Sequence, residues 1–405
     1  MAVGLGPLPD FHPIEGIRIG VASAGIKKPG RKDTVVFELA EGCTTAATFT
    51  RNQFCAAPVT LARAHLSQQV PRYLVINTGN ANAGTGKAGL EAATRTCSAL
   101  AALGAVATET VLPFSTGVIG ELLPVDKLEK ALPAAVDDLR ADGWADAASG
   151  IMTTDTLPKG ATCRIEIDGH PVHFSGVSKG AGMIRPNMAT MLAFVATDAR
   201  IEKTLLQTLL GEVVESSFNR ITVDGDTSTN DACVLTATGR SAAPAITADG
   251  PHLGVFREAL RQLFVTLAQA IIRDGEGATK FVTVRVEQAA TQKEALDVAY
   301  TVAQSPLVKT ALYASDPNWG RILAAVGRAG VEDLVIEGIS IYLGDVCIVR
   351  DGARAEDYTE ELGQGVMDRA EIEIRIELGR GKVSETVWTS DFSHDYVTIN
   401  AEYRT

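Results

Sequence analysis

One threonine of the chain occupies a position where its hydroxyl can serve as a nucleophile. Thr190 follows the small residue Ala189 and precedes an apolar run that ends at Phe194, and the loop before it contains Gly180 and Gly182. Such a hydroxyl either bonds to a backbone carbonyl within a strand or attacks a carbonyl carbon. Residue type alone favours the first interpretation, because most buried threonines simply satisfy a carbonyl.

Two other short segments carry groups that an acyl-transfer site needs. Ser115-Thr116-Gly117 predicts a turn after an apolar strand, which either ends that strand or supplies hydrogen-bond donors to a tetrahedral oxyanion. Glu276 stands between Gly275 and Gly277 after a helical stripe. It is either a solvated charge at a helix C-cap or a carboxylate that reaches the amine of a ligand. Both alternatives remain open on the residues alone.

A resemblance to a known family favours the chemical interpretations. Residues 179–192 read K-G-x-G-M-I-x-P-x-M-A-T-M-L, which resembles the signature of the ornithine acetyltransferase family of arginine biosynthesis. Further stretches resemble the same family in the same order: residues 49–52 (FTRN), 77–82 (NTGNAN), 113–119 (PFSTGVI), 153–156 (TTDT), 222–231 (TVDGDTSTND), 274–280 (DGEGATK) and 316–321 (DPNWGR). This ordered set spans nearly the whole chain and is more specific than any single match.

The resemblance implies that the precursor cuts itself. Cleavage of the bond between Ala189 and Thr190 would give an α chain of residues 1–189 and a β chain of residues 190–405. The hydroxyl of Thr190 would attack its own preceding carbonyl, and the small Ala189 would tolerate the strained turn that this step needs. The α-amine that cleavage releases, with a reference pKa of about 7.7 to 8.0, can then act as the general base for that hydroxyl.

The resemblance also implies which residues form the site. Thr116 and Gly117 would make the oxyanion hole, and Lys179 would bind the substrate carboxylate as a point charge. Glu276 would meet the positively charged α-ammonium group of the substrate. Three further substrate contacts are implied: Thr153, Asn400 and Thr405. The last of these means that the end of the chain returns to the active site.

The activity implied is ping-pong acetyl transfer through an acetyl-threonine ester. N2-acetyl-L-ornithine would acetylate Thr190, and L-glutamate would take the acetyl group, giving L-ornithine and N-acetyl-L-glutamate. Acetyl-CoA is expected as a second donor, and no bound cofactor is expected. One alternative is a self-cleaving aminopeptidase or amidase of related fold, which the threonine disfavours because those enzymes use serine. Another is a binding protein that never cleaves.

The elements that position these groups follow from hydrophobic spacing. Residues 73–76 form an apolar strand, and apolar positions at helical spacing predict a helix that contains Leu90 and ends before Gly104. Further helices are predicted at 125–139, 201–218 and 256–273, with Ile201 and Leu205 in the buried stripe of the second.

After Gly275 the pattern changes to half-exposed strands, such as the alternation of apolar and polar residues at 282–287 and 372–378. The spacing predicts a mixed α/β protein, and the resemblance implies an α-β-β-α sandwich with a smaller C-terminal α/β domain. We expect a large domain of residues 1–280 and a smaller one of residues 281–405.

Composition limits the classes of partner. The chain has 405 residues, with 37 Lys and Arg against 49 Asp and Glu, so its formal net charge of −12 argues against a nucleic-acid binder. No apolar run reaches the length of a membrane span, and no signal sequence is evident, so we expect a cytoplasmic protein. The cysteines and histidines are dispersed, and no metal site is expected. The resemblance implies a heterotetramer of α and β chains.

Overall fold

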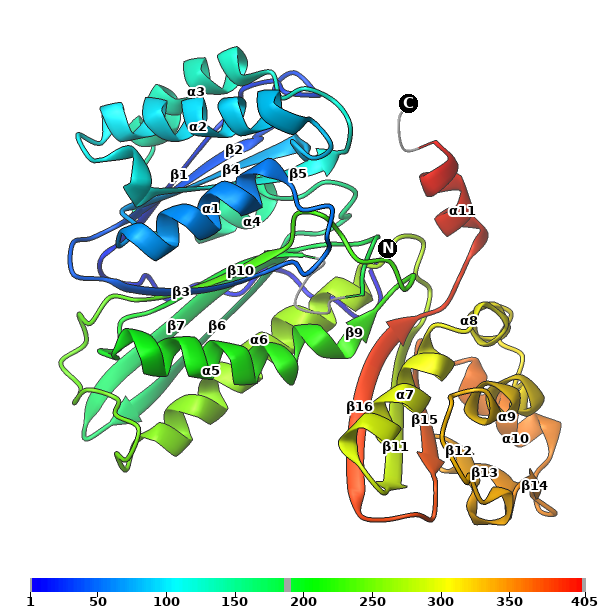
Figure 1. Ribbon diagram of the computed structural model, residues 1–405. Coiled ribbons are helices and arrows are strands. Elements are labelled where there is room, and N and C mark those ends of the chain that lie inside the picture. The colour runs from blue at the N-terminus through cyan, green and yellow to red at the C-terminus, as the bar shows by residue number, and fades with distance from the viewer. Residues whose placement is uncertain (1, 186–190, 403–405) are drawn as a thin grey trace.

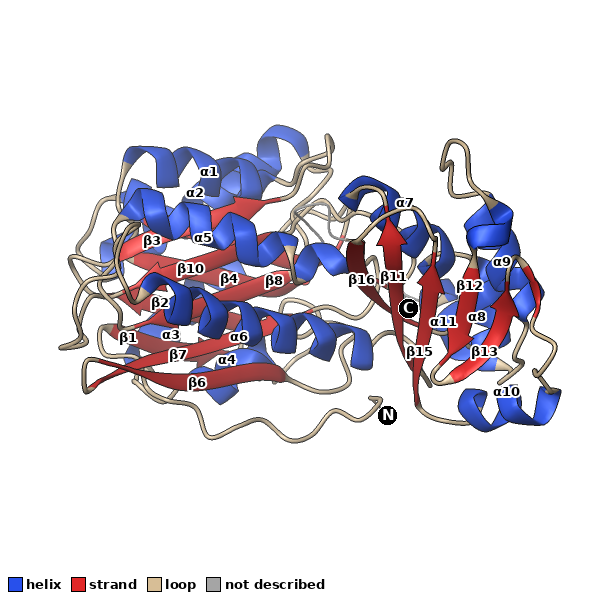
Figure 2. Cartoon of the chain, turned by 90° about the horizontal axis from the view of Figure 1, so that it is seen from below, coloured by secondary structure: helices blue, strands red, loops and turns tan. Residues whose placement is uncertain are grey.

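The computed structural model of the chain describes residues 2–185 and 191–402. It contains both helices and strands throughout, so the mixed α/β fold expected from the sequence is confirmed. Among the described residues the strands form sheets of four, five and seven strands. The first two sheets are stacked with helices outside them, and the third lies beside this stack with helices of its own (Figure 1, Figure 2).

The first sheet has the order β1–β2–β4–β5, and its strands are β1 (Ile17–Ala22), β2 (Thr34–Leu39), β4 (Tyr73–Asn80) and β5 (Val111–Val118). The predicted strand at Tyr73 is confirmed as the start of β4. Helices α2 (Gly86–Leu103) and α3 (Val125–Asp137) cover the outer face, and α1 (Ala57–Gln68) lies along β5. Because β4 and β5 run parallel, both end at the same edge of the sheet.

The second sheet has the order β3–β10–β8–β7–β6, and its strands are β3 (Thr44–Phe49), β6 (Lys159–Ile167), β7 (His170–Lys179), β8 (Leu192–Thr197) and β10 (Ala232–Ala237). Helices α5 (Lys203–Glu215) and α6 (Leu253–Arg273) cover its outer face, while α4 (Trp144–Gly150) contacts β1 and β7. β8 is antiparallel to β7 and parallel to β10. The end of β7 therefore meets the starts of β8 and β10 at one edge.

The two sheets share an apolar core. Phe194 of β8 lies against Phe37 of β2 and Phe114 of β5, with ring centroids 5.4 and 5.1 Å apart. Trp144 of α4 also packs against Phe37, at a centroid distance of 5.8 Å. This stacking holds the end of β5 over the end of β7, so that the polar termini of several strands meet.

The predicted helices are present, with two corrections to their buried faces. The side chain of Glu202 accepts hydrogen bonds from the backbone N–H groups of Thr204 and Leu205, so α5 begins after Glu202. Ile201 therefore lies outside the helix, where it forms a β-bridge with Ile246. The buried stripe of α5 is consequently Leu206, Leu209, Leu210, Val213 and Val214. In α2 the predicted stripe residue Leu90 is 41% exposed.

The third sheet has the order β14–β13–β12–β15–β11–β16–β9. Its strands are β9 (Ile221–Thr222), β11 (Phe281–Ala289), β12 (Ser340–Leu343), β13 (Val346–Arg350), β14 (Ala353–Arg354), β15 (Glu371–Glu377) and β16 (Val383–Ser390). Its helices are α7 (Gln292–Ala303), α8 (Pro306–Tyr313), α9 (Trp319–Gly327) and α10 (Glu360–Met367). A core drawn from residues 282–387 fills this part, and β9 joins it to the preceding chain by pairing with β16.

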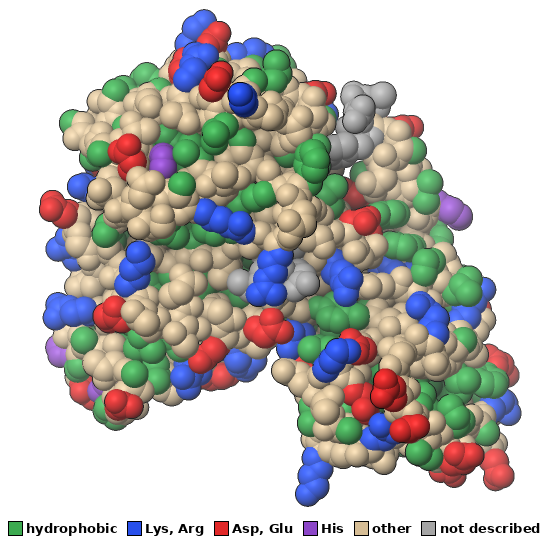
Figure 3. Space-filling model, viewed as in Figure 1, with side chains coloured by type: hydrophobic (Ala, Val, Ile, Leu, Met, Phe, Trp, Pro, Cys, Tyr) green, Lys and Arg blue, Asp and Glu red, His purple; other side chains and the backbone are tan. Residues whose placement is uncertain are grey.

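After β16 the chain turns back toward the stacked sheets and forms α11 (His394–Ala401) (Figure 1). The stacked rings of Phe392 and Tyr396, 4.7 Å apart, stiffen this return. On the face shown in Figure 3, basic and acidic side chains are interspersed. Within the described parts of the chain, every helix is too short or too polar to cross a membrane.

Candidate active site

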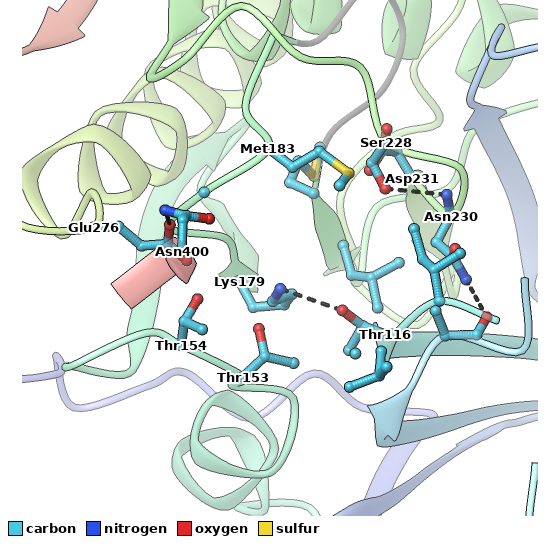
Figure 4. A pocket seen from close by; sticks show the side chains of 17 residues that line it. Thr116, Thr153, Thr154, Lys179, Met183, Ser228, Asn230, Asp231, Glu276 and Asn400 are labelled. Atoms are coloured by element: carbon cyan, nitrogen blue, oxygen red, sulfur yellow. Dashed lines mark hydrogen bonds between the residues drawn. The ribbon is translucent and has the colours of Figure 1, made fainter. Parts of the chain in front are cut away.

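A cavity of about 300 Å³ lies where β5 and β7 end and β8 and β10 begin. The structure brings six of the residues predicted from the sequence to its wall: Thr116, Gly117, Thr153, Lys179, Glu276 and Asn400. All of these except Gly117 are labelled in Figure 4. The other three predicted positions, Ala189, Thr190 and Thr405, lie outside the described residues. Met191 and Leu192, the next residues after Thr190 in the sequence, also line the cavity.

Thr116 and Gly117 lie within β5, which corrects the turn expected at this point. They belong to the strand because they pair with Thr78 and Gly79 of β4. The backbones approach so closely that a Cβ on Gly117, at φ +137°, would lie 2.3 Å from the backbone carbon of Gly79. A glycine is therefore required at position 117, and it leaves bare backbone at the cavity wall.

Lys179, the last residue of β7, crosses the cavity toward β5. Its ammonium group donates a hydrogen bond to the hydroxyl of Thr116 at 3.2 Å (Figure 4). Burial lowers the pKa of Lys179, and the nearby carboxylates of Asp155, Asp231 and Glu276 act in the opposite direction. The amine of Lys179 thus lies among three acidic groups.

A buried ion cluster lies behind these residues, and sequence reasoning did not find it. The ammonium group of Lys159 lies 2.6 Å from Asp155 and 2.6 Å from Asp274, and all three side chains are at most 1% exposed. Asp155 also accepts from the backbone N–H groups of Thr153, at 2.9 Å, and Gly180, at 2.8 Å. Although buried, Asp155 has a pKa below its usual range, because Lys159, Lys179 and these hydrogen bonds outweigh desolvation.

The ion cluster ties together the loops that carry the predicted site residues. Asp155 fixes the backbone next to Lys179 and that of Thr153, and Asp274 lies two residues before Glu276. The sequence contained a signal, because both aspartates belong to the stretches 153–156 and 274–280 that carry the family resemblance. Their pairing through Lys159 could not be read from spacing.

Glu276 and Asn400 meet on the side of the cavity that faces α11. The side-chain amide of Asn400 donates to the Glu276 carboxylate at 2.7 Å, and the backbone N–H of Glu276 donates to Ala181 at 2.9 Å. A Cβ on Gly182 would lie 2.2 Å from this carboxylate, so glycine permits the close approach. The expected return of the chain end is thus present as far as Asn400.

The loop before β10 forms the opposite side of the cavity, and its polar residues were not singled out from the sequence. The side-chain amide of Asn230 donates to the carbonyls of Ala81, at 2.6 Å, and Ser115, at 2.9 Å. Thr50 donates to the carbonyl of Ser228 at 2.8 Å. These bonds join the stretches around residues 50, 80, 115 and 230 that carry the family resemblance.

A second cavity of about 250 Å³ adjoins the first. The two share Gly117 and Thr153 in their walls, and Lys28 and Arg31 also line the second. Arg31 donates to the backbone carbonyl of Met152 at 2.6 Å and so supports the loop that carries Thr153. In the described parts of the chain, no group of three or more His, Cys, Asp or Glu side chains is arranged to hold a metal ion.

The chain as a whole is similar to known proteins of one family. The sequence profile of the ArgJ family matches residues 18–405. The chain is 61% identical to the arginine biosynthesis bifunctional protein ArgJ of Pseudomonas syringae pv. tomato, with all of both chains covered. It is 60% identical to the protein of the same name from Methylococcus capsulatus, over 97% of this chain and 96% of that one. Among solved structures, the ArgJ protein of Bacillus halodurans matches at 40% identity and a TM-score of 0.49, over 50% of this chain and 95% of that one.

Proposed function

The chain belongs to the ArgJ family, and from this premise we propose that it transfers the acetyl group of N2-acetyl-L-ornithine to L-glutamate. The products are L-ornithine and N-acetyl-L-glutamate. The names of the relatives support an enzyme of arginine biosynthesis. The observation that carries the proposal is that one cavity gathers six residues from distant segments that the sequence motifs assign to acyl transfer.

Thr190 is the nucleophile in this proposal. Self-cleavage between Ala189 and Thr190 frees an α-amine, which takes the proton of the Thr190 hydroxyl as that oxygen attacks the acetyl carbonyl. The resulting ester conserves the acyl bond until glutamate arrives. Transfer without hydrolysis requires that bound substrate excludes water from the ester.

Thr116 and Gly117 are proposed to stabilise the oxyanion of each tetrahedral intermediate. Because the Thr116 hydroxyl accepts from Lys179, its own proton remains available for donation into the cavity. Gly117 contributes backbone that no side chain covers. Removing one donor of this kind typically costs about 3 to 4 kcal/mol of transition-state stabilisation.

The remaining predicted residues hold the amino-acid part of the substrate. Lys179 binds its carboxylate, and Glu276, oriented by Asn400, binds its ammonium group. Thr153 lies on the wall that the buried ion cluster fixes. Thr405 is proposed as a further contact, on the motif resemblance.

Two further parts of the proposal concern the donor and the assembly. Acetyl-CoA is proposed as a second acetyl donor, and Lys28 and Arg31 beside the second cavity are cations suited to its phosphate groups. The processed α and β chains are proposed to assemble as a heterotetramer. A self-cleaving aminopeptidase or amidase is the alternative, and it predicts hydrolysis in place of transfer to glutamate.

The test is a product assay on the purified, processed protein. N-acetylornithine with glutamate should yield ornithine and N-acetylglutamate in equal amounts, and the Thr190→Ala variant should yield neither. Release of acetate in place of N-acetylglutamate would favour the hydrolase. Release of free CoA that depends on glutamate would support acetyl-CoA as donor.

A further inference from the structure

Asp231 presents a buried carboxyl group to the cavity without a partner for one of its oxygens. The residue is 4% exposed and forms part of the cavity wall. Its Oδ2 atom has no hydrogen-bond partner among the described groups. Buried polar atoms in folded proteins are nearly always bonded, so an unpaired carboxyl oxygen on a residue of the cavity wall calls for a functional explanation.

The backbone around Asp231 is fixed on both sides. The backbone N–H of Thr50 donates to the Asp231 carbonyl at 3.0 Å, and that of Ala232 donates to the Met191 carbonyl at 3.0 Å. Asn230, the residue before Asp231, is bonded to β5, because its side-chain amide donates to the Ser115 carbonyl. The unpaired oxygen therefore belongs to a hydrogen-bonded part of the wall, one residue from the start of β10.

The surroundings of this carboxyl group act on its pKa in opposite directions. Burial raises the pKa of Asp231 well above its usual range, while the Ser228 side chain, the positive charge of Lys179 and the Met191 backbone act to lower it. Glu276 is the other acidic group of the wall, and its Oε2 already accepts from Asn400. Asp231 is thus the second carboxyl group of the wall, and it differs from Glu276 in having an oxygen without a described partner.

We propose that Asp231 exchanges one proton with the reacting amine of the substrate in each half of the acetyl transfer. This inference rests on the proposed function. Free ornithine and glutamate carry an ammonium group, whereas the acetylated nitrogen is a neutral amide. Each half-reaction must therefore move two protons on or off nitrogen, and the α-amine of Thr190 relays only the proton of the hydroxyl.

In the first half, the amide C–N bond of acetylornithine breaks as the ester C–O bond forms. The leaving nitrogen receives the hydroxyl proton through the Thr190 α-amine and a second proton from the neutral carboxyl of Asp231, so ornithine leaves as an ammonium. In the second half, the ammonium of glutamate gives one proton to the Asp231 carboxylate and attacks as a neutral amine. Its second proton returns through the α-amine to the hydroxyl as the ester C–O bond breaks.

The experiment compares Asp231→Asn with wild type and with Asp226→Asn. The control makes the same change on an exposed carboxylate of the same loop, outside the cavity. All three proteins should self-cleave, as seen by intact mass, and bind ornithine similarly. At neutral pH the kcat of Asp231→Asn should fall about 100-fold. The kcat of Asp231→Asn should then rise with pH, because a glutamate amine that is already neutral needs no proton acceptor. The kcat of Asp226→Asn should match that of wild type at every pH.

A second variant separates proton exchange from a structural role. Asp231→Ala removes the carboxyl group, and added formate should restore part of its activity by supplying one. Asp231→Asn activity within twofold of wild type at every pH would overturn the inference, and so would a loss that neither pH nor formate reverses. A variant that remained one chain would also contradict it, because the defect would then lie in processing. Wild-type protein without any acetyl transfer would instead refute the proposed function.

Discussion

Lys159 offers the sharpest test of how the fold holds the candidate site. Its ammonium group lies 2.6 Å from both Asp155 and Asp274, and none of the three side chains is more than 1% exposed. Lys159→Met keeps the apolar stem but leaves two buried carboxylates without a cation. Removing one partner of a buried ion pair typically costs about 3 to 5 kcal/mol, so we expect a loss of that size in the free energy of unfolding.

The same substitution should disturb substrate binding, because Asp155 also holds the backbone of Thr153 and Gly180. We expect KM for acetylornithine to rise more steeply than kcat falls. The measurements are urea unfolding and steady-state kinetics. The matched control is Lys293→Met, which removes an exposed lysine paired with Asp297 and should change neither quantity.

Two results would refute this reasoning. Lys159→Met could unfold within about 0.5 kcal/mol of wild type, as an ordinary surface substitution does. Alternatively, it could lose stability and keep an unaltered KM. The first result would mean that the ion cluster is not buried as described. The second would mean that the cluster supports the fold without positioning the site.

Three other changes test separate parts of the account. Gly117→Ala places a Cβ 2.3 Å from Gly79, so acetyl transfer should fall at least about 100-fold in a steady-state assay, and near-normal activity would show that the strands are not this close. Asn400→Ala removes the donor to Glu276, so KM should rise about 10-fold with kcat nearly constant, whereas an unchanged KM would place α11 outside the site. Burial lowers the pKa of Lys309 to about 7 in the folded protein, whereas the unfolded chain keeps the ordinary lysine value of about 10.4. Between these two pH values the unfolded chain binds more protons than the folded one, so the free energy of unfolding should rise with pH. Urea unfolding of Lys309→Met should lack this rise, and an identical pH profile in both proteins would contradict the assignment.

Much of the fold was predictable where one face of an element is apolar. α3 and α6 carry apolar stripes at helical spacing, and their predicted ranges agree with the structure to within three residues. The stacking of the first two sheets was implied by resemblance and not by spacing. Strands such as β4 and β8 are buried on both faces, so they read as continuous apolar runs that reveal neither partner nor register.

The site was predictable only in part for a related reason. Thr116, Lys179 and Glu276 could be named because the motifs around them resemble a family. Asp155 and Lys159 are four residues apart, a spacing that resembles an exposed helical ion pair, whereas the structure buries both on a loop and a strand. Sequence gives no measure of such burial, and the unpaired oxygen of Asp231 depends on it as well.

The central claim is that Thr190 becomes the N-terminal nucleophile of a self-cleaved enzyme. Intact mass of the purified protein beside its Thr190→Ala variant tests this most directly. We predict two fragments from the wild type, residues 1–189 and 190–405, with masses that correspond to cleavage of the 42.7 kDa precursor between Ala189 and Thr190. We predict a single uncut chain from the variant. An uncut wild-type protein that still transfers acetyl groups would contradict the claim.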